Sequence, residues 1–209
     1  MNHRNLLGFF AKYPEQGKVK TRLAKDIGPE NTVSFYRRMV EHVLKRTASS
    51  DSAYDRIVFY TPDTMGKQFA DWLKGERLLP QQGIDIGERM HTALQEMFDI
   101  GADKAIVIGG DIPDLDKEII SAAFQQLDSA DIVIGPALDG GYYLIGMNSP
   151  HREVFQNITW STGKVLDETL LLIRKMGLTH RTVTPLFDVD GYEDFLRVKE
   201  MLNDTNPEL

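Results

Sequence analysis

The sequence predicts an α/β protein in which helices cover both faces of a mostly parallel, mixed sheet, a three-layer α/β/α and Rossmann-like arrangement. Short apolar runs typical of strands alternate with longer stretches of helical period along the 209 residues. Parallel strands need crossover helices, so this alternation favours a largely parallel sheet. Such sheets bind ligands at the carboxyl ends of their strands.

The elements are expected in a regular order. Apolar runs of strand type cover residues 6–11, 56–60, 105–108, 131–136, 143–147 and 180–183. Stretches of helical period between them cover about residues 29–48, 65–74, 87–100, 116–127, 163–176 and 191–203. The fourth and fifth strands are too close in sequence for a crossover, so we expect an antiparallel element there, a departure from a pure Rossmann topology. No linker is evident, and residues 1–209 are expected to form one domain with a dispensable tail after about Asn203.

Composition narrows the class of protein. A chain of 209 residues can bury roughly 70% of its unfolded surface and needs no metal or disulfide to form its core. The absence of cysteine excludes thiol catalysis, thiolate metal sites and disulfides. A pI near 5.2 argues against general nucleic-acid binding. No apolar run is long enough for a membrane span, and the N-terminus does not resemble a signal peptide, so we expect a cytoplasmic protein.

A basic loop follows the first predicted strand. In a chain of net charge −7, its candidate phosphate-binding residues are Lys12, Gly17, Lys18, Lys20 and Arg22. A strand that leads through a glycine-containing basic turn into a helix is a usual way to hold phosphates, by backbone N–H groups, the helix N-terminus and cationic side chains together. We therefore expect a nucleotide ligand. The alternative is a solvated, lysine-rich loop.

Two acidic positions predict a metal site. Asp111 stands where an apolar strand ends in two glycines, and a carboxylate there, opposite a phosphate loop, suits Mg²⁺. The second acid is expected to be Asp188 or Asp190, which point the same way if their segment is extended, and Asp190 is favoured. The alternatives are structural: Asp111 would cap the following helix, and Asp190 would cap the last helix with Glu193 as its capping-box partner.

Two further segments carry weaker signals. Asp139 precedes two glycines and the paired tyrosines Tyr142 and Tyr143, which would form a platform for an acceptor with Asp139 as a base or orienting group. The alternative is a tight turn without further function. The segment Trp160-Ser-Thr is typical of a helix N-cap preceded by an aromatic residue, and an acceptor pocket is the alternative.

A side-chain amide near the middle of the chain is a candidate for nucleotide recognition. Gln82, Gly83 and Asp85 are suited to base or ribose contacts, because an amide can read a base edge and glycine permits close approach. For Asp85 the alternative is a surface pair with Arg89.

Three of these motifs, in their order along the chain, carry a resemblance. They are the loop with Lys-Thr-Arg-Leu, the strand ending Gly-Gly-Asp-Ile-Pro, and the late Val-Asp-Gly-Tyr-Glu-Asp-Phe. Together they resemble the nucleotide-diphospho-sugar transferase, or GT-A, superfamily. Within it the chain is most similar to small bacterial proteins known as DUF2064 or transferase 1 glycosyltransferases, which resemble molybdenum-cofactor and phospholactate guanylyltransferases. The resemblance covers nearly the whole chain and implies a GT-A fold.

The resemblance also implies roles for individual residues. By position, Lys12, Lys20 and Arg22 correspond to contacts with a di- or triphosphate, and Asp111 and Asp190 to ligands of Mg²⁺ or Mn²⁺. The chain departs from the superfamily pattern in two places. Lys12-Tyr-Pro replaces the glycines that usually open the nucleotidyltransferase loop, and Gly-Tyr replaces Thr-Pro in the late signature.

These observations predict a metal-dependent transferase that uses a nucleotide-activated donor and an unidentified small-molecule acceptor. The catalytic residues expected are Asp111, Arg22, Lys20 and Asp139. Glycosyl transfer from a nucleotide sugar is preferred. The close alternative is nucleotidyl transfer from a nucleoside triphosphate to a phosphorylated acceptor with release of pyrophosphate, and a further alternative is a non-catalytic nucleotide-binding module. The base, the sugar, the acceptor and the oligomeric state stay open.

Overall fold

A single mixed sheet forms the centre of the computed structural model, which describes residues 4–49 and 53–203. Its strands are β1 (Asn5–Lys12), β2 (Asp55–Thr61), β3 (Arg77–Pro80), β4 (Lys104–Gly109), β5 (Ile132–Pro136), β6 (Tyr142–Met147) and β7 (His180–Thr182). They lie in the order β3-β2-β1-β4-β6-β5-β7. Among the described strands, only β6 runs antiparallel to its neighbours, β4 and β5. The predicted mixed, mostly parallel sheet is therefore confirmed, with its antiparallel element in the expected place.

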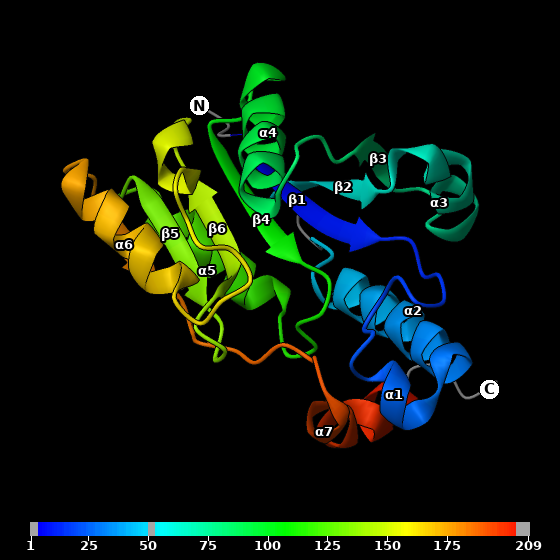
Figure 1. Ribbon diagram of the computed structural model, residues 1–209. Coiled ribbons are helices and arrows are strands. Elements are labelled where there is room, and N and C mark those ends of the chain that lie inside the picture. Colours follow the sequence, from blue (N-terminus) through cyan, green and yellow to red (C-terminus); the bar gives the residue numbers. More distant parts are fainter. Residues whose placement is uncertain (1–3, 50–52, 204–209) are drawn as a thin grey trace.

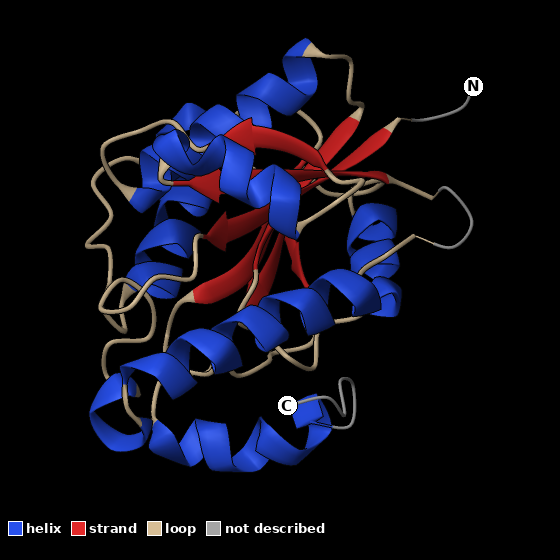
Figure 2. Ribbon diagram, turned by 90° about the vertical axis from the view of Figure 1, so that its right-hand side faces the viewer, coloured by secondary structure: helices blue, strands red, loops and turns tan. Residues whose placement is uncertain are grey.

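Helices cover both faces of this sheet (Figures 1 and 2). The α-helices are α1 (Ala24–Ile27), α2 (Pro29–Arg46), α3 (Gly66–Trp72), α4 (Ile86–Asp99), α5 (Lys117–Gln126), α6 (Val165–Lys175) and α7 (Tyr192–Asn203). Short 3-10 turns, η1 (Asp63–Met65) and η2 (Arg152–Phe155), complete the described elements. Buried residues of α2, α3, α5 and α7 form one core, and those of α4, η2 and α6 form the other. The three-layer architecture is confirmed.

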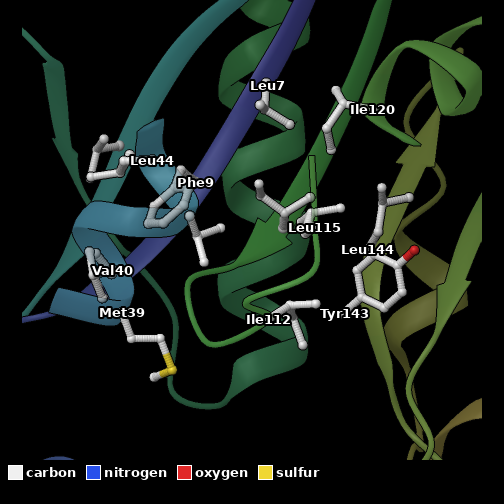
Figure 3. Close-up of a cluster of buried hydrophobic side chains, with 14 of the residues drawn as sticks. Leu7, Phe9, Met39, Val40, Leu44, Ile112, Leu115, Ile120, Tyr143 and Leu144 are labelled. Atoms are coloured by element: carbon white, nitrogen blue, oxygen red, sulfur yellow. The ribbon is translucent and has the colours of Figure 1, made fainter. Parts of the chain in front are cut away.

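The alternation of strand side chains creates the two cores. In β1, Leu7 and Phe9 pack on the side of α2 and α5, where Figure 3 shows them among other buried side chains. Leu6 and Phe10 belong to the opposite core, beside α4. Successive side chains of a strand point to opposite faces, so a central strand that is covered on both faces must be apolar throughout.

Some boundaries differ from those predicted. Strand β3 was not predicted, because its four residues include Pro80, and it lies at the sheet edge with its side chains only partly buried. The four-residue helix α1 was also missed. The single helix expected over residues 65–74 is a 3-10 turn followed by α3, and α6 starts at Val165. Residues 204–209, the tail expected to be dispensable, lie outside the described part of the chain.

The site is located by the connections of the central strands. Parallel strands β1 and β4 are neighbours, and the sheet extends from β1 toward β2 and β3 on one side and from β4 toward β6 on the other. A crevice forms outside the carboxyl ends of strands at such a switch point, because the two connections leave in opposite directions. Strands β1 and β4 both end at this crevice, β1 at Lys12 and β4 at Gly109.

Candidate active site

A cavity of about 400 Å³ opens at the carboxyl ends of β1 and β4. Its polar walls include Lys12, Tyr36, Thr61, Gln81, Arg89, Asp111, Asp139 and Asp188. A more open cleft continues from it across the basic loop, past Lys20, Arg22 and Asp190. Lys12, Tyr36 and Asp111 line both spaces, and they mark the passage from the inner cavity to the outer cleft.

Opposite charges meet at this passage. The ammonium of Lys20 lies 2.9 Å from Oδ2 of Asp111 and 2.8 Å from Oδ1 of Asp190, and its side chain is only 9% exposed. Arg22 lies 3.5 Å from the other carboxylate oxygen of Asp190 but is 79% exposed. The structure thus brings together four of the residues predicted from the sequence. The solvated-loop interpretation is wrong for Lys20, whose side chain is largely shielded from solvent.

Apolar residues on both sides of Lys20 hold the loop in place. Val19 and Leu23 are buried in the core beneath it. Gly17 turns the chain with a φ of 71°, and Lys20 itself has a φ of 40°. Such a value is uncommon for a residue with a side chain and persists where the surroundings hold it. The loop therefore presents Lys20 inward while Lys18 and Arg22 stay exposed.

Asp111 and Asp190 are joined through the main chain as well as through Lys20. The N–H of Val189 donates to the carbonyl of Asp111 at 3.1 Å, which ties the loop before α7 to the end of β4. A Cβ at Gly110 would lie 3.0 Å from the Phe9 ring, which is tighter than ordinary contact, so glycine eases this close passage. The capping alternatives are wrong. Asp116 caps α5, and the carboxylate of Asp190 pairs with cations two residues before α7 begins.

The charges of the cluster shift its pKa values. Burial alone would lower the pKa of Lys20, but the charges of Asp111 and Asp190 outweigh burial and raise it. Burial likewise would raise the pKa of Asp190, yet the ammonium of Lys20 lowers it. Asp188 faces the cavity instead, and its pKa is raised to about 6 by burial and then by Asp111, Asp139 and Asp190. Of the two late acids, Asp190 is the one beside Lys20.

Tyr36 is a site residue that the sequence did not reveal. Its hydroxyl accepts a hydrogen bond from the N–H of Lys12 at 3.2 Å and lies at the passage between cavity and cleft. Burial raises its pKa to about 12, so the hydroxyl keeps its proton at neutral pH. The accepted bond leaves that proton available to a ligand.

The predicted base-contact segment is displaced by one residue. Gln81, not Gln82, lines the cavity, and its amide donates to the carbonyl of Phe59 at 2.9 Å. Gln82 and Gly83 are exposed and do not line the cavity. Asp85 caps α4 by accepting from the N–H of Glu88. The expected surface pair of Asp85 is also absent from the described contacts, because Arg89 donates to the carbonyl of Gly83.

Tyr142 and Tyr143 both line the cavity, but their rings do not form one platform. Tyr142 and Tyr143 are consecutive in β6, so their rings point to opposite faces of the sheet. Tyr143 lies in the core shown in Figure 3 and donates to the carbonyl of Thr184 at 2.8 Å. Asp139 closes a tight turn by accepting from the N–H of Gly141 at 2.8 Å, as the structural alternative proposed. It also lines the cavity, so its catalytic role stays a prediction.

Trp160 lies over a second opening of the site. Its ring packs edge-on to Tyr142 and lies directly over Gly87, where a Cβ would come within 2.3 Å of it. The helix-cap interpretation of this segment is wrong, since α6 begins at Val165 with no side-chain cap. Trp160, Arg22, Asp139 and Asp190 instead line a common cleft. This cleft adjoins the charge cluster through Arg22 and Asp190.

The described residues contain neither a larger metal-binding group nor a membrane-spanning helix. Among residues 4–49 and 53–203, no three His, Asp or Glu side chains are grouped so that they could hold a metal ion. A cation beside Asp111 and Asp190 would therefore need further oxygen ligands from a bound substrate. No helix in the same ranges has the length and apolar character of a membrane span.

Known proteins resemble this chain in both sequence and fold. Residues 43–162 match the family DUF2064, described as an uncharacterized protein conserved in bacteria. A solved structure from Desulfovibrio desulfuricans G20, provisionally named a nucleotide-diphospho-sugar transferase, is 36% identical, covers 98% of this chain and 89% of that chain, and has a TM-score of 0.88.

More distant relatives are nucleotide-using enzymes. Phosphoenolpyruvate guanylyltransferase of Chloroflexus aggregans is 25% identical over 121 residues, which is 56% of this chain and 59% of that protein's length. The structure of CMP:2-keto-3-deoxy-manno-octonic acid synthetase with CTP is 15% identical over 99% of this chain and 100% of that chain, with a TM-score of 0.58, and shows the shared fold. The predicted superfamily fold is confirmed, and transferase is the class named for the first two relatives.

Proposed function

Because the chain belongs to the DUF2064 family and has the nucleotide-diphospho-sugar transferase fold, we propose that it is a metal-dependent nucleotidyltransferase. It would transfer a nucleoside monophosphate from a nucleoside triphosphate to a phosphorylated acceptor. The observation that carries this proposal is the cluster of Lys20, Asp111 and Asp190 at the mouth of a nucleotide-sized cavity.

The two carboxylates fit a divalent cation. Asp111 and Asp190 each place one oxygen within 2.9 Å of a single cationic atom, the Nζ of Lys20. Mg²⁺ takes oxygen ligands and is usually held by one or two carboxylates together with substrate phosphates. A bound Mg²⁺ or Mn²⁺ would neutralise phosphate oxygens and stabilise the charge that develops on the leaving group.

The other contacts to the nucleotide come from side chains of this protein. The nucleoside occupies the inner cavity, and the phosphates pass Lys12 and the hydroxyl of Tyr36 into the outer cleft. Lys20 and Arg22 then face the β- and γ-phosphates. Their positive charges stabilise the pyrophosphate as it leaves.

The bond changes are those of a direct displacement. An oxygen of the acceptor phosphate forms a bond to the α-phosphorus, and the bond from that phosphorus to the oxygen bridging to the β-phosphorus breaks. Pyrophosphate leaves with the electron pair of the broken bond. Neither a covalent enzyme intermediate nor a general base is needed, since the acceptor phosphate is already ionised.

Nucleotidyl transfer is proposed ahead of glycosyl transfer for two reasons. Tyr142 and Tyr143 both line the cavity, but their rings point to opposite faces of the sheet and so do not form the single platform that favoured a sugar acceptor. The relatives from Chloroflexus aggregans and Sphaerobacter thermophilus are both named phosphoenolpyruvate guanylyltransferases. Glycosyl transfer remains the second candidate, because the relative with 36% identity carries a nucleotide-diphospho-sugar transferase name.

Product analysis distinguishes the two reactions. The protein is incubated with each common nucleoside triphosphate, Mg²⁺ or Mn²⁺, and phosphoenolpyruvate as the first acceptor, and then with nucleotide sugars and sugar acceptors. Acceptor-dependent release of pyrophosphate supports the proposal. Release of a nucleoside diphosphate from a nucleotide sugar, without pyrophosphate from any triphosphate, would replace it with glycosyl transfer.

The metal assignment has its own test. Asp111→Asn should abolish Mn²⁺-dependent nucleotide binding and leave the melting temperature nearly unchanged, because this side chain is partly exposed and lies outside the core. Asp114→Asn, an exposed change of the same charge three residues away, is the matched control. Retained Mn²⁺-dependent affinity in Asp111→Asn would disprove the metal role.

A further inference from the structure

The position of Lys20 has a consequence for how the cation binds. Its ammonium lies within 2.9 Å of one oxygen from Asp111 and one from Asp190, the same two carboxylates that fit a divalent cation. A divalent cation and an ammonium cannot share this place, since their charges repel at contact distance. We propose that Lys20 is an internal counter-cation that occupies the metal position in the nucleotide-free protein and transfers to the phosphates when metal and nucleotide bind. This inference rests on the proposed function.

Burial explains why a positive charge must always be present there. Asp188 and Asp139 lie in the surrounding walls. Together with Asp111 and Asp190 they place four carboxylates in and around the cavity. Without a cation these charges would repel one another in a partly desolvated site. Lys20, with a side chain that is 9% exposed, is the buried partner, whereas Arg22 is mostly in solvent. Lys20 therefore neutralises the pair until another cation replaces it.

The loop allows the exchange without unfolding. Lys20 lines the open cleft that lies beside the charge cluster, so its long side chain can turn toward phosphates there. Its φ of 40° is a conformation held by the surrounding contacts, and the two ion pairs are among these. Val19 and Leu23 stay anchored in the core during such a movement.

The exchange couples two ligands. A cation that arrives alone must displace Lys20 into solvent, whereas one that arrives with a nucleotide gives the ammonium a new anionic partner. Metal and nucleotide should therefore raise each other's affinity, and such coupling is reciprocal and commonly about 5- to 150-fold. The protein would hold little metal when nucleotide is absent.

Mn²⁺ alone is the probe that tests the exchange. Electron paramagnetic resonance measures free Mn²⁺ during titration of the wild-type chain and of Lys20→Met. Removal of the internal cation should tighten Mn²⁺ binding by about tenfold or more, within the usual range of coupling. Lys25→Met, an exposed change of the same charge in α1, should leave Mn²⁺ affinity unchanged. Lys20→Gln repeats the measurement if Lys20→Met fails to fold, as judged by its melting curve.

A double variant identifies the atoms involved. In Lys20→Met combined with Asp111→Asn, the gained Mn²⁺ affinity should disappear. Unchanged or weaker Mn²⁺ binding in Lys20→Met overturns the inference, and so does a gain that survives the second change. If Asp111→Asn alone still abolishes Mn²⁺-dependent nucleotide binding, the proposed function survives such a failure. The two ideas thus fail by different measurements.

Discussion

The hydroxyl of Tyr36 can be removed without changing the shape of the side chain. In Tyr36→Phe the ring keeps its place in the core on the buried face of α2, while the acceptor for the N–H of Lys12 is lost. The hydroxyl proton, which the bond from Lys12 leaves free for a phosphate or ribose oxygen, is lost as well. We predict weaker nucleotide binding with a small loss of stability.

The size of both effects follows from the contacts. One neutral hydrogen bond, at 3.2 Å to the Lys12 N–H, contributes about 0.5–1.5 kcal/mol to folding. For a chain of this length each kcal/mol lowers the melting temperature by about 2–4 °C. A hydrogen bond to a charged phosphate contributes about 1.5–3 kcal/mol, which corresponds to a loss of about 10- to 140-fold in affinity.

Calorimetric titration with a nucleoside triphosphate and Mn²⁺ measures the affinity, and a thermal melt measures the stability. Tyr54→Phe is the matched control, since its buried hydroxyl donates to the carbonyl of Thr47 at 2.8 Å and does not line the cavity. It should lose similar stability and no affinity. The reasoning is refuted if Tyr36→Phe binds nucleotide as tightly as the wild type, or if both variants lose affinity equally.

Three further changes test the loop, a turn and a buried base. Arg22→Ala should weaken nucleotide binding about tenfold or more in a calorimetric titration. Lys18→Ala should weaken it less, because of these two side chains it is Arg22 that reaches the charge cluster. Equal small losses would contradict this. Gly140→Ala should lower the melting temperature by several degrees. Gly140 has a φ of 91°, and a Cβ there would lie 2.3 Å from the carbonyl oxygen of Gly163. An unchanged melting temperature would count against this prediction. Burial lowers the pKa of His42, so its neutral form contributes stability that is full above its unfolded pKa of about 6.5 and is lost as the pH falls toward the lower folded pKa. His42→Gln should therefore lose less stability than the wild type in denaturant titrations between pH 7.5 and pH 5.5, and equal losses would disprove the shift.

Much of the fold could be predicted because its signals are local. Helix α2 buries Phe35, Met39 and Val43 at four-residue spacing, and the apolar runs of β1 and β4 are those of strands covered on both faces. Asp111 and the basic loop were found for a related reason. Both follow strands whose ends meet at one edge of a parallel sheet, so proximity follows from topology alone.

The missed residues depend on information that a local pattern lacks. Tyr36 occupies a buried position of an amphipathic helix, and only the position of that helix beneath Lys12 reveals its hydroxyl as part of the site. The choice between Gln81 and Gln82 depended on where β3 ends. Neighbouring residues after a strand face opposite sides, so an error of one position reverses the assignment. The same alternation separates Tyr142 from Tyr143.

The hydrogen bond from Val189 to Asp111 has a consequence for the synthesis of the protein. Asp190 and Lys20 are 170 residues apart, and their contact closes only after the segment carrying Asp190 has docked against β4. Translation adds about 5–20 residues per second and proceeds from the N-terminus, so the loop with Lys20 leaves the ribosome many seconds before its second carboxylate. A nascent chain that has already formed β1 and β4 still lacks the complete charge cluster. Under the proposed function, capture of metal and nucleotide would be postponed until the sheet is assembled.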